Sequence, residues 1–519
     1  MTPLINRSFR VLWLTTLVSN TCVWMNEVAA AWLMTAHTSS PLFVALIQAA
    51  SALPVFLLSL PSGALVDNLH KPTCLLVTQA WTAITACLTY YSLSNTDFSP
   101  YLLLSLLFCT SVGVAFRGPT VSALTAEYVC AKELPSALAL NSVSMNISRV
   151  IGPMVAGVII STSSVYIVFL VNAVLSLATS ALLLFSTGKE SAYPTHEPEK
   201  FMMALGAGIR FFLASEILKS VIARMFIFAC MTTSLLSMLP LVARSISTGS
   251  LTAPVAYTSL LIATGLGALL AVFSISALRS HCSNHALIMG GTLLQAFTLL
   301  IAITTTHLYM MWPLMVCIGF SMLVTGNSLS LRAQLALPHW MKARGMALYQ
   351  MATIGGTLVG ALLWGTLALH TSMQLSFLVA ALICSALILF LSHRSHLDDD
   401  IEDLTLIPNV PKPHLDHERA GEVVVQIEYR IASEDVENFL NLMQQSRSNR
   451  LRKGAIHWRL TNEWHDPDLY IEEFIDPNLH AHWRRFERVT AQDMALRAEK
   501  LAFHHSQHPP IVRRFFKIS

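Results

Sequence analysis

The sequence predicts an all-α membrane protein with twelve transmembrane helices in two six-helix halves, followed by a small cytoplasmic α+β domain. Of the 519 residues, 54% are hydrophobic and 12% are charged, whereas an average soluble domain carries about 25% charged residues. Mean hydropathy is +0.56. Long apolar segments recur up to about residue 392, and the pattern then becomes polar. This composition excludes a soluble enzyme and a disordered chain.

The charge is divided unevenly along the chain. Residues 1–397 carry 17 Lys and Arg against 9 Asp and Glu, and residues 398–519 carry 16 against 21. All nine cysteines lie singly in the first part, between Cys22 and Cys384, with no CxxC pair. We interpret them as small buried apolar residues, so neither a metal site nor a cofactor is expected.

Twelve segments are long and apolar enough to be spanning helices, which need about 20 residues each. The first is too long, and is followed by too many others, to be a cleaved signal peptide. The predicted spans are residues 9–36, 41–66, 73–93, 100–122, 139–161, 166–186, 221–243, 253–278, 284–306, 309–331, 345–369 and 372–392.

Basic residues in the loops predict the orientation of the chain in the membrane. With the N-terminus inside, Arg244 is the one basic residue of the outside loops. Both termini are therefore expected in the cytoplasm. The basic residues of the cytoplasmic segments are Arg7, Arg10, Lys71, Lys132, Lys189, Lys200, Arg210, Lys219, Arg279, Lys342, Arg344 and Arg394.

A short internal repeat supports the division of the spans into two groups of six. A shift of 208 residues brings Gly152 onto Gly360 and Gly157 onto Gly365, so that span five matches span eleven. The expected organisation is an N-terminal half at 1–186, a cytoplasmic central loop at 187–220, a C-terminal half at 221–392, a linker at 393–420 and a cytoplasmic domain at 421–519.

Three stretches carry a family resemblance: residues 9–13 with 24–26 and 31–33, residues 63–67, and residues 146–157. Together they resemble the branch of the major facilitator superfamily that contains the enterobactin exporter and related transmembrane secretion effectors. The resemblance implies a multi-pass exporter of the bacterial inner membrane, driven by proton antiport. Its partners would be the lipid bilayer, protons and a small-molecule substrate, with no nucleic acid and no enzymatic activity.

Span five resembles the antiporter motif of that superfamily. Gly152 and Gly157 let a neighbouring helix approach closely, and Pro153 removes a backbone donor and bends the helix. A bend at a packing seam suits a helix that packs in two ways during alternating access. Ordinary tight packing is the alternative, because Gly and Pro are frequent in spanning helices.

The loop after span two departs from the superfamily pattern. Gly63 and Asp67 fit it, but Asn68 stands where an Arg is expected, and His70-Lys71 replaces a Gly-Arg pair. Asp67 still pairs with or caps a neighbouring helix in this interpretation. Any charge lock at this loop is expected to be weaker.

Charged residues at membrane depth are rare and indicate functional sites. Glu27 is the one carboxylate well inside a span, and it shares a helical stripe with Asn20 and Trp24. A carboxylate in an apolar cavity holds a proton more readily than in water, which suits proton coupling. The alternative is a glutamate wetted at the outer interface.

Two arginines complete the candidate site. Arg149 lies near mid-depth in span five, and Arg117 lies in the cytoplasmic third of span four. Arg149 either pairs with Glu27 or binds an anionic substrate, or it binds backbone carbonyls near the bend at Pro153. The rise per residue separates it from Glu27 by roughly 10 Å in depth, so the two would meet through water or substrate.

The C-terminal region has the pattern of a β-α-β-β-α domain. Residues 423–431 alternate as a strand, Ser433 caps a helix over 434–450, a hairpin spans 455–475, and a last helix covers 478–504. This order resembles ferredoxin-like domains of the antibiotic-biosynthesis-monooxygenase type, whose members dimerise through their sheets. We interpret its histidines as surface residues instead of metal ligands; they are His480, His482, His504, His505 and His508.

Three functions remain open from the sequence. The first is proton-coupled export of a small metabolite, with a siderophore foremost. The second is broad multidrug efflux on the same scaffold. The third is a transporter-like scaffold whose tail does the sensing.

Overall fold

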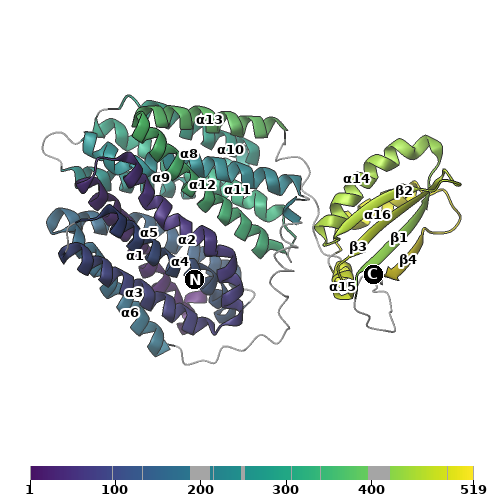
Figure 1. Ribbon diagram of the computed structural model, residues 1–519, viewed down its shortest axis with the longest axis horizontal. Coiled ribbons are helices and arrows are strands. Elements are labelled where there is room, and N and C mark those ends of the chain that lie inside the picture. Colours follow the sequence, from purple (N-terminus) through teal and green to yellow (C-terminus); the bar gives the residue numbers. More distant parts are fainter. Residues whose placement is uncertain are drawn as a thin grey trace. The chain divides into compact units, whose positions relative to one another are not determined.

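The computed structural model describes residues 2–95, 98–130, 133–186, 211–213, 215–246, 252–305, 307–338, 341–394, 421–487 and 489–517. Its long helices, shown in Figure 1, form two groups along the chain. The first group is α1 (Arg7–His37), α2 (Pro41–Asn68), α3 (Lys71–Asn95), α4 (Pro100–Tyr128), α5 (Leu134–Thr162) and α6 (Val165–Ser186). The second group is α8 (Glu216–Ile246), α9 (Ala253–His281), α10 (Asn284–Ala302), α11 (Leu308–Leu335), α12 (Lys342–His370) and α13 (Met373–Arg394).

Ten of the helices in the described part of the chain are long and apolar enough to cross a membrane. Each of the twelve predicted spans coincides with one long helix. α1 and α3, of 31 and 25 residues, fall outside the ten. α1 contains Asn20, Asn26 and Glu27, and α3 contains five threonines, which lower their hydropathy. The mostly helical membrane fold is therefore confirmed, and spans at α1 and α3 stay predictions.

The first pair of repeat-related glycines makes equivalent contacts in the two groups. A Cβ atom on Gly152 of α5 would overlap the Cβ atom of Trp24 on α1. A Cβ atom on Gly360 of α12 would lie 2.8 Å from the carbonyl oxygen of Cys230 on α8. Each glycine thus brings its helix against the first helix of its own group, because no side chain keeps the backbones apart.

The second pair joins helices of different groups. A Cβ atom on Gly157 would overlap the side chain of Thr258 on α9, and one on Gly365 would lie 2.7 Å from the Cβ atom of Ala45 on α2. The contacts α5–α9 and α2–α12 therefore depend on two glycines that the 208-residue repeat relates. A larger residue at either position would force the two groups apart.

The residues fall into two compact units. The first contains most of the long helices and a large apolar cluster, to which α1, α8 and α9 contribute Leu33, Leu235 and Leu260 among others. The second contains the C-terminal domain together with short segments around Phe211 and Pro338.

The C-terminal domain is built on one antiparallel sheet with the strand order β2–β3–β1–β4. Its elements are β1 (Val423–Arg430), α14 (Val436–Arg452), β2 (His457–Asn462), β3 (Leu469–Asp476), α15 (Leu479–Glu487), α16 (Ala491–Ala502) and β4 (Ile511–Phe516). Val423, Val425 and Tyr429 alternate along β1 and are buried on one face. Phe439 and Met443 of α14 pack with Tyr429, whereas Val423 and Val425 belong to a second apolar cluster.

Two elements of this domain differ from the prediction. The single helix expected at 478–504 is wrong: it is divided into α15 and α16. The first part ends at Glu487, and Thr490 starts the second, because its side chain and that of Asp493 form a capping box. A further strand, β4, was not predicted; it is a six-residue edge strand whose apolar pattern is interrupted by Arg513 and Arg514.

Ser433 does not cap the helix that follows β1. It begins a short 3-10 turn, Ser433–Asp435, and α14 starts only at Val436 without a side-chain cap. Most of the predicted central loop and nearly all of the predicted linker lie outside the described residues.

Candidate functional site

A cavity of about 780 Å³ lies within the first compact unit. All six helices of the first group line it, α3 and α6 with one residue each, together with α8, α11 and α12 of the second group. Its volume falls in the range of pockets that enclose small organic molecules. Both helix groups therefore contact whatever occupies this space.

The charged side chains of the cavity lining are Glu27 and Arg149, both from the first group. The Arg149 guanidinium lies over the Trp24 ring, with its central carbon 5.3 Å from the ring centroid. Its Nε is buried and has no hydrogen-bond partner in the described part of the chain. No hydrogen bond or ion pair joins Glu27 to Arg149 there. The structure thus brings Trp24, Glu27 and Arg149 into one cavity.

Asn20 and Arg117 lie outside the cavity lining. The Arg117 Nη2 donates to the Asn20 Oδ1 over 2.9 Å, and Arg117 is 8% exposed. The bond ties α4 to α1 one turn before Trp24. These two residues therefore contact each other, and the structure does not place them beside Glu27 in the cavity wall.

The second group contributes a neutral polar wall. α12 presents Tyr349, Gln350, Thr353 and Thr357 to the cavity, and α11 presents Asn327. The hydroxyl side chains of this wall were not among the predicted site residues. Their spacing could have revealed them, because residues 349, 353 and 357 recur every four positions and therefore lie on one helical face.

Two polar contacts hold the helix ends near the predicted conformational motifs. Lys71 forms an ion pair with Glu127, which joins the start of α3 to the end of α4. Arg279 at the end of α9 donates to the Oδ1 of Asn327 over 2.8 Å. The surroundings of Gly63 and of the Asp67 side chain lie outside the described part of the structure. Pro153 is inside α5, next to Gly152.

The C-terminal domain holds a second buried glutamate, Glu472 of β3, which is 0% exposed. It accepts hydrogen bonds from Tyr429 over 3.2 Å and from Ser446 over 2.8 Å. Ion pairs join it to Arg450 at 3.2 Å and to Lys500 at 3.3 Å. Burial raises the pKa of Glu472, but the charges of Arg450 and Lys500 more than offset this, so the pKa lies far below its usual range. This glutamate is a structural ion.

His482 is not a surface residue, contrary to the prediction. It is 1% exposed, and its Nδ1 lies 2.9 Å from the Oδ2 of Asp476. Asp476 also pairs with Arg485. Burial raises the pKa of Asp476, yet the Arg485 charge and the His482 hydrogen bond leave it below its usual range. No group of three candidate metal ligands occurs in the described residues.

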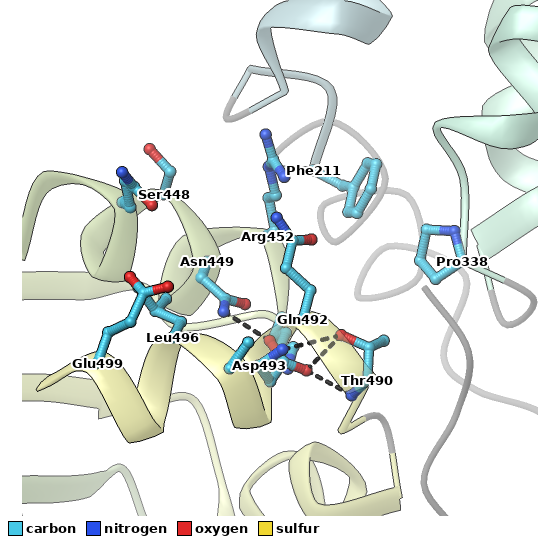
Figure 2. A pocket seen from close by; sticks show the side chains of 13 residues that line it. Phe211, Pro338, Ser448, Asn449, Arg452, Thr490, Gln492, Asp493, Leu496 and Glu499 are labelled. Atoms are coloured by element: carbon cyan, nitrogen blue, oxygen red, sulfur yellow. Dashed lines mark hydrogen bonds and ion pairs between the residues drawn. The ribbon is translucent and has the colours of Figure 1, made fainter. Parts of the chain in front are cut away.

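A hollow of about 350 Å³ lies between the end of α14 and the start of α16 (Figure 2). Asp493 accepts hydrogen bonds from Asn449 over 2.5 Å and from the Thr490 backbone over 2.5 Å, and it pairs with Lys453. Phe211 and Pro338, in short segments of the same compact unit, complete the lining. The Asp493 carboxylate therefore already serves to hold the two helices together.

Comparison with known proteins places the chain among membrane transporters. Residues 1–519 match the family described as transmembrane secretion effector. A relative from Bacillus subtilis (strain 168), the MFS-type transporter YfiS, is 26% identical over 167 residues. That match covers 32% of this chain and 39% of YfiS, so it spans well under half of the relative.

Solved structures agree on the fold. A mutant form of the nucleoside transporter NupG has a TM-score of 0.61 at 11% identity, covering 74% of this chain and 100% of that one. A bacterial homologue of the human lysosomal transporter Spinster, inward-facing and unoccupied, has a TM-score of 0.60 at 14% identity, covering 74% and 96%. Because the family match covers its full length, the chain belongs to the transmembrane secretion effector family of major facilitator superfamily transporters.

Proposed function

We propose that this protein exports a small metabolite across the bacterial inner membrane by alternating access, with a siderophore as the first candidate. The observation that carries the proposal is the cavity shared by both helix groups, in which Glu27 and Arg149 face one space without being joined. Charged groups at membrane depth are costly and therefore mark pathways for ions or substrates.

In this proposal the chain crosses the membrane twelve times, with both termini in the cytoplasm. The loop arginines and lysines support the orientation, because Arg244 is alone on the outer side. Arg244 donates to the carbonyl oxygen of Thr35 over 2.8 Å, which joins the outer ends of α8 and α1. The seams at Gly157 and Gly365 are near the same ends. These contacts support a state that is closed outside and open to the cytoplasm.

Glu27 is the proposed proton carrier of an antiport cycle. The second helix group contributes no acidic residue to the described cavity lining, and the sequence has none between Glu216 and Asp398. Glu27 lies within electrostatic range of Arg149, although no direct bond joins them. Proton uptake at Glu27 would change the net charge of the cavity from neutral to positive and so alter its hold on a substrate.

The C-terminal domain is proposed to be ferredoxin-like and to join two copies of the chain through its sheet. The strand order β2–β3–β1–β4 supports the fold. Ile511 and Phe515 of β4 are 52% and 45% exposed on the face away from α14, which supports the pairing. Phe515→Glu should then convert a dimer to a monomer in light scattering of the detergent-solubilised chain, and an unchanged mass contradicts the pairing.

Export is tested by an untargeted comparison of small molecules in the medium of iron-limited cells. The strains carry the intact chain, no chain, Glu27→Gln, a chain ending at residue 397, and Glu216→Gln as the matched control. Glu216 is exposed and pairs only with Lys219 of its own helix in the described structure.

We expect one chelator to disappear from the medium without the chain and with Glu27→Gln, and to remain with Glu216→Gln. If the chelator disappears only when the tail after residue 397 is removed, the result favours a transporter-like scaffold whose tail does the sensing. Matching media in all strains contradict metabolite export, and loss of drug efflux in the same strains then favours the multidrug transporter.

A further inference from the structure

The two charged side chains of the cavity, Glu27 and Arg149, face the same space without a direct bond between them. Trp24 and Glu27 are three residues apart and share one face of α1, which separates them by one helical turn. The guanidinium of Arg149 stands over the Trp24 ring at 5.3 Å. The side of the cavity formed by α1 and α5 therefore presents a cation, an aromatic ring and a carboxylate. The charged atoms of Glu27 and Arg149 do not approach within the 4.0 Å of an ion pair.

The second helix group offers no counter-charge to Glu27 or Arg149 among the described lining residues. The second helix group faces the cavity with amides, hydroxyls and apolar side chains, among them Gln350, Thr353 and Asn327. None of the lining residues described in that group is Asp, Glu, Lys or Arg. Such a wall donates and accepts hydrogen bonds equally, so it does not select the sign of a ligand's charge. That selection falls to Glu27 and Arg149.

A ligand with one charge leaves one of these two groups unmatched. Removing an ion from water is costly unless a counter-charge meets it, and this holds for both the ligand and the cavity. A single anion satisfies Arg149 and leaves Glu27 facing it at close range. A single cation satisfies Glu27 and leaves Arg149 facing it. A molecule with both charges matches the two groups together.

We infer that the cavity binds dipolar organic molecules, with an anionic acceptor at Arg149 and a cationic or strongly donating group at Glu27. The inference rests on the proposed transport function and names its substrate class. Arg149 supplies the free Nε as a donor, and Trp24 holds the guanidinium plane in place. Glu27 accepts from the other end of the ligand.

The test measures binding to the purified full-length chain in lipid nanodiscs. Three labelled probes share an indole ring and a chain of similar length: L-tryptophan carries both charges, tryptamine the cation, and indole-3-propionate the anion. We expect L-tryptophan to bind at least about 10-fold more tightly than either other probe, which corresponds to one lost charge contact.

Two variants divide the effect. Arg149→Gln should weaken L-tryptophan to the level of tryptamine, and Glu27→Gln should weaken it to the level of indole-3-propionate. Arg149→Lys should restore part of the preference, which guards against loss through misfolding. Arg7→Gln and Glu216→Gln, both at exposed positions, should leave all three affinities unchanged.

The inference is overturned if either singly charged probe binds as tightly as L-tryptophan, if none of the three binds, or if each variant weakens all three equally. The medium comparison separates this failure from failure of the proposed function. A lost metabolite with a single charge overturns only the substrate class, whereas matching media overturn export whatever the probes show.

Discussion

Glu27 in the helical unit is partly exposed in the wall of a cavity, whereas Glu472 in the C-terminal domain is fully buried, and their surroundings differ. Glu472 meets Tyr429, Ser446, Arg450 and Lys500, which satisfy both of its oxygens. Glu27 faces a cavity, and the described residues offer it no hydrogen bond or ion pair. A carboxylate with a full set of partners is part of the fold. One that lacks them is available to protons and ligands.

The largest effect expected from this contrast is the loss of Glu472. Glu472→Gln leaves Arg450 and Lys500 buried without their counter-charge, so we expect the C-terminal domain to lose about 3–5 kcal/mol. Limited proteolysis of the full chain should show the domain cut at far lower protease concentration. Glu463→Gln, at an exposed position, is the control. Equal resistance of both variants contradicts a structural role.

Acid should act on the same domain. The pKa values of Glu472, Asp476 and Asp493 lie below their usual ranges. Groups with a lowered pKa stabilise the fold above their unfolded value and lose that contribution as pH falls below it. From pH 5 to pH 3, Glu472 alone should account for roughly 2 kcal/mol, at about 1.4 kcal/mol per unit. Denaturant unfolding of the C-terminal domain at both pH values measures this loss of stability. An unchanged unfolding midpoint contradicts the prediction.

Overpacking at Gly152 tests whether the cavity wall is held in position. A Cβ atom there would overlap that of Trp24, so Gly152→Ala should cost about 1–3 kcal/mol and shift the ring beneath Arg149. Thermal unfolding and export measure the two consequences. Gly118→Ala is the matched control, because no atom lies within 4 Å of its Cβ position. Similar losses for both variants would show that any added methyl is harmful.

The smallest effect on stability is expected at Glu27. Glu27→Gln removes no partner and keeps the shape of the side chain, so thermal unfolding of the helical unit should change by less than about 1 kcal/mol. Export should nevertheless be lost. A large drop in stability would mean that Glu27 is structural like Glu472, and the contrast between the two glutamates would no longer hold.

The sequence predicted the features that depend on rare residues or long patterns. Ten of the predicted spans coincide with helices that are long and apolar enough to cross a membrane, because about twenty apolar residues in a row are typical of spanning helices. Glu27 and Arg149 stood out because charges at depth are scarce. The repeat at Gly152 and Gly157 predicted that span five matches span eleven, and in the structure the glycines of α5 and of α12 both lie at close helix contacts.

Other features depend on partners that a sequence does not display. Arg117 of α4 donates a hydrogen bond to Asn20 of α1, and nothing in the sequence of either helix indicates this bond. His482 is buried because Asp476 accepts from it. The hydroxyls of α12 escaped notice because Ser and Thr are frequent in spanning helices, and β4 because Arg513 and Arg514 interrupt a strand of six residues.

The neutral wall on α11 and α12 has a consequence for how such transporters diversify. In the proposed transport cycle, α1 and α5 recognise the charge of the substrate, whereas α11 and α12 line the cavity with neutral polar side chains. Substitutions such as Thr353→Val or Gln350→Leu change the fit of a substrate without altering the electrostatics of the cavity. New substrates can therefore be acquired in one part of the chain while the coupling chemistry is inherited unchanged in the other.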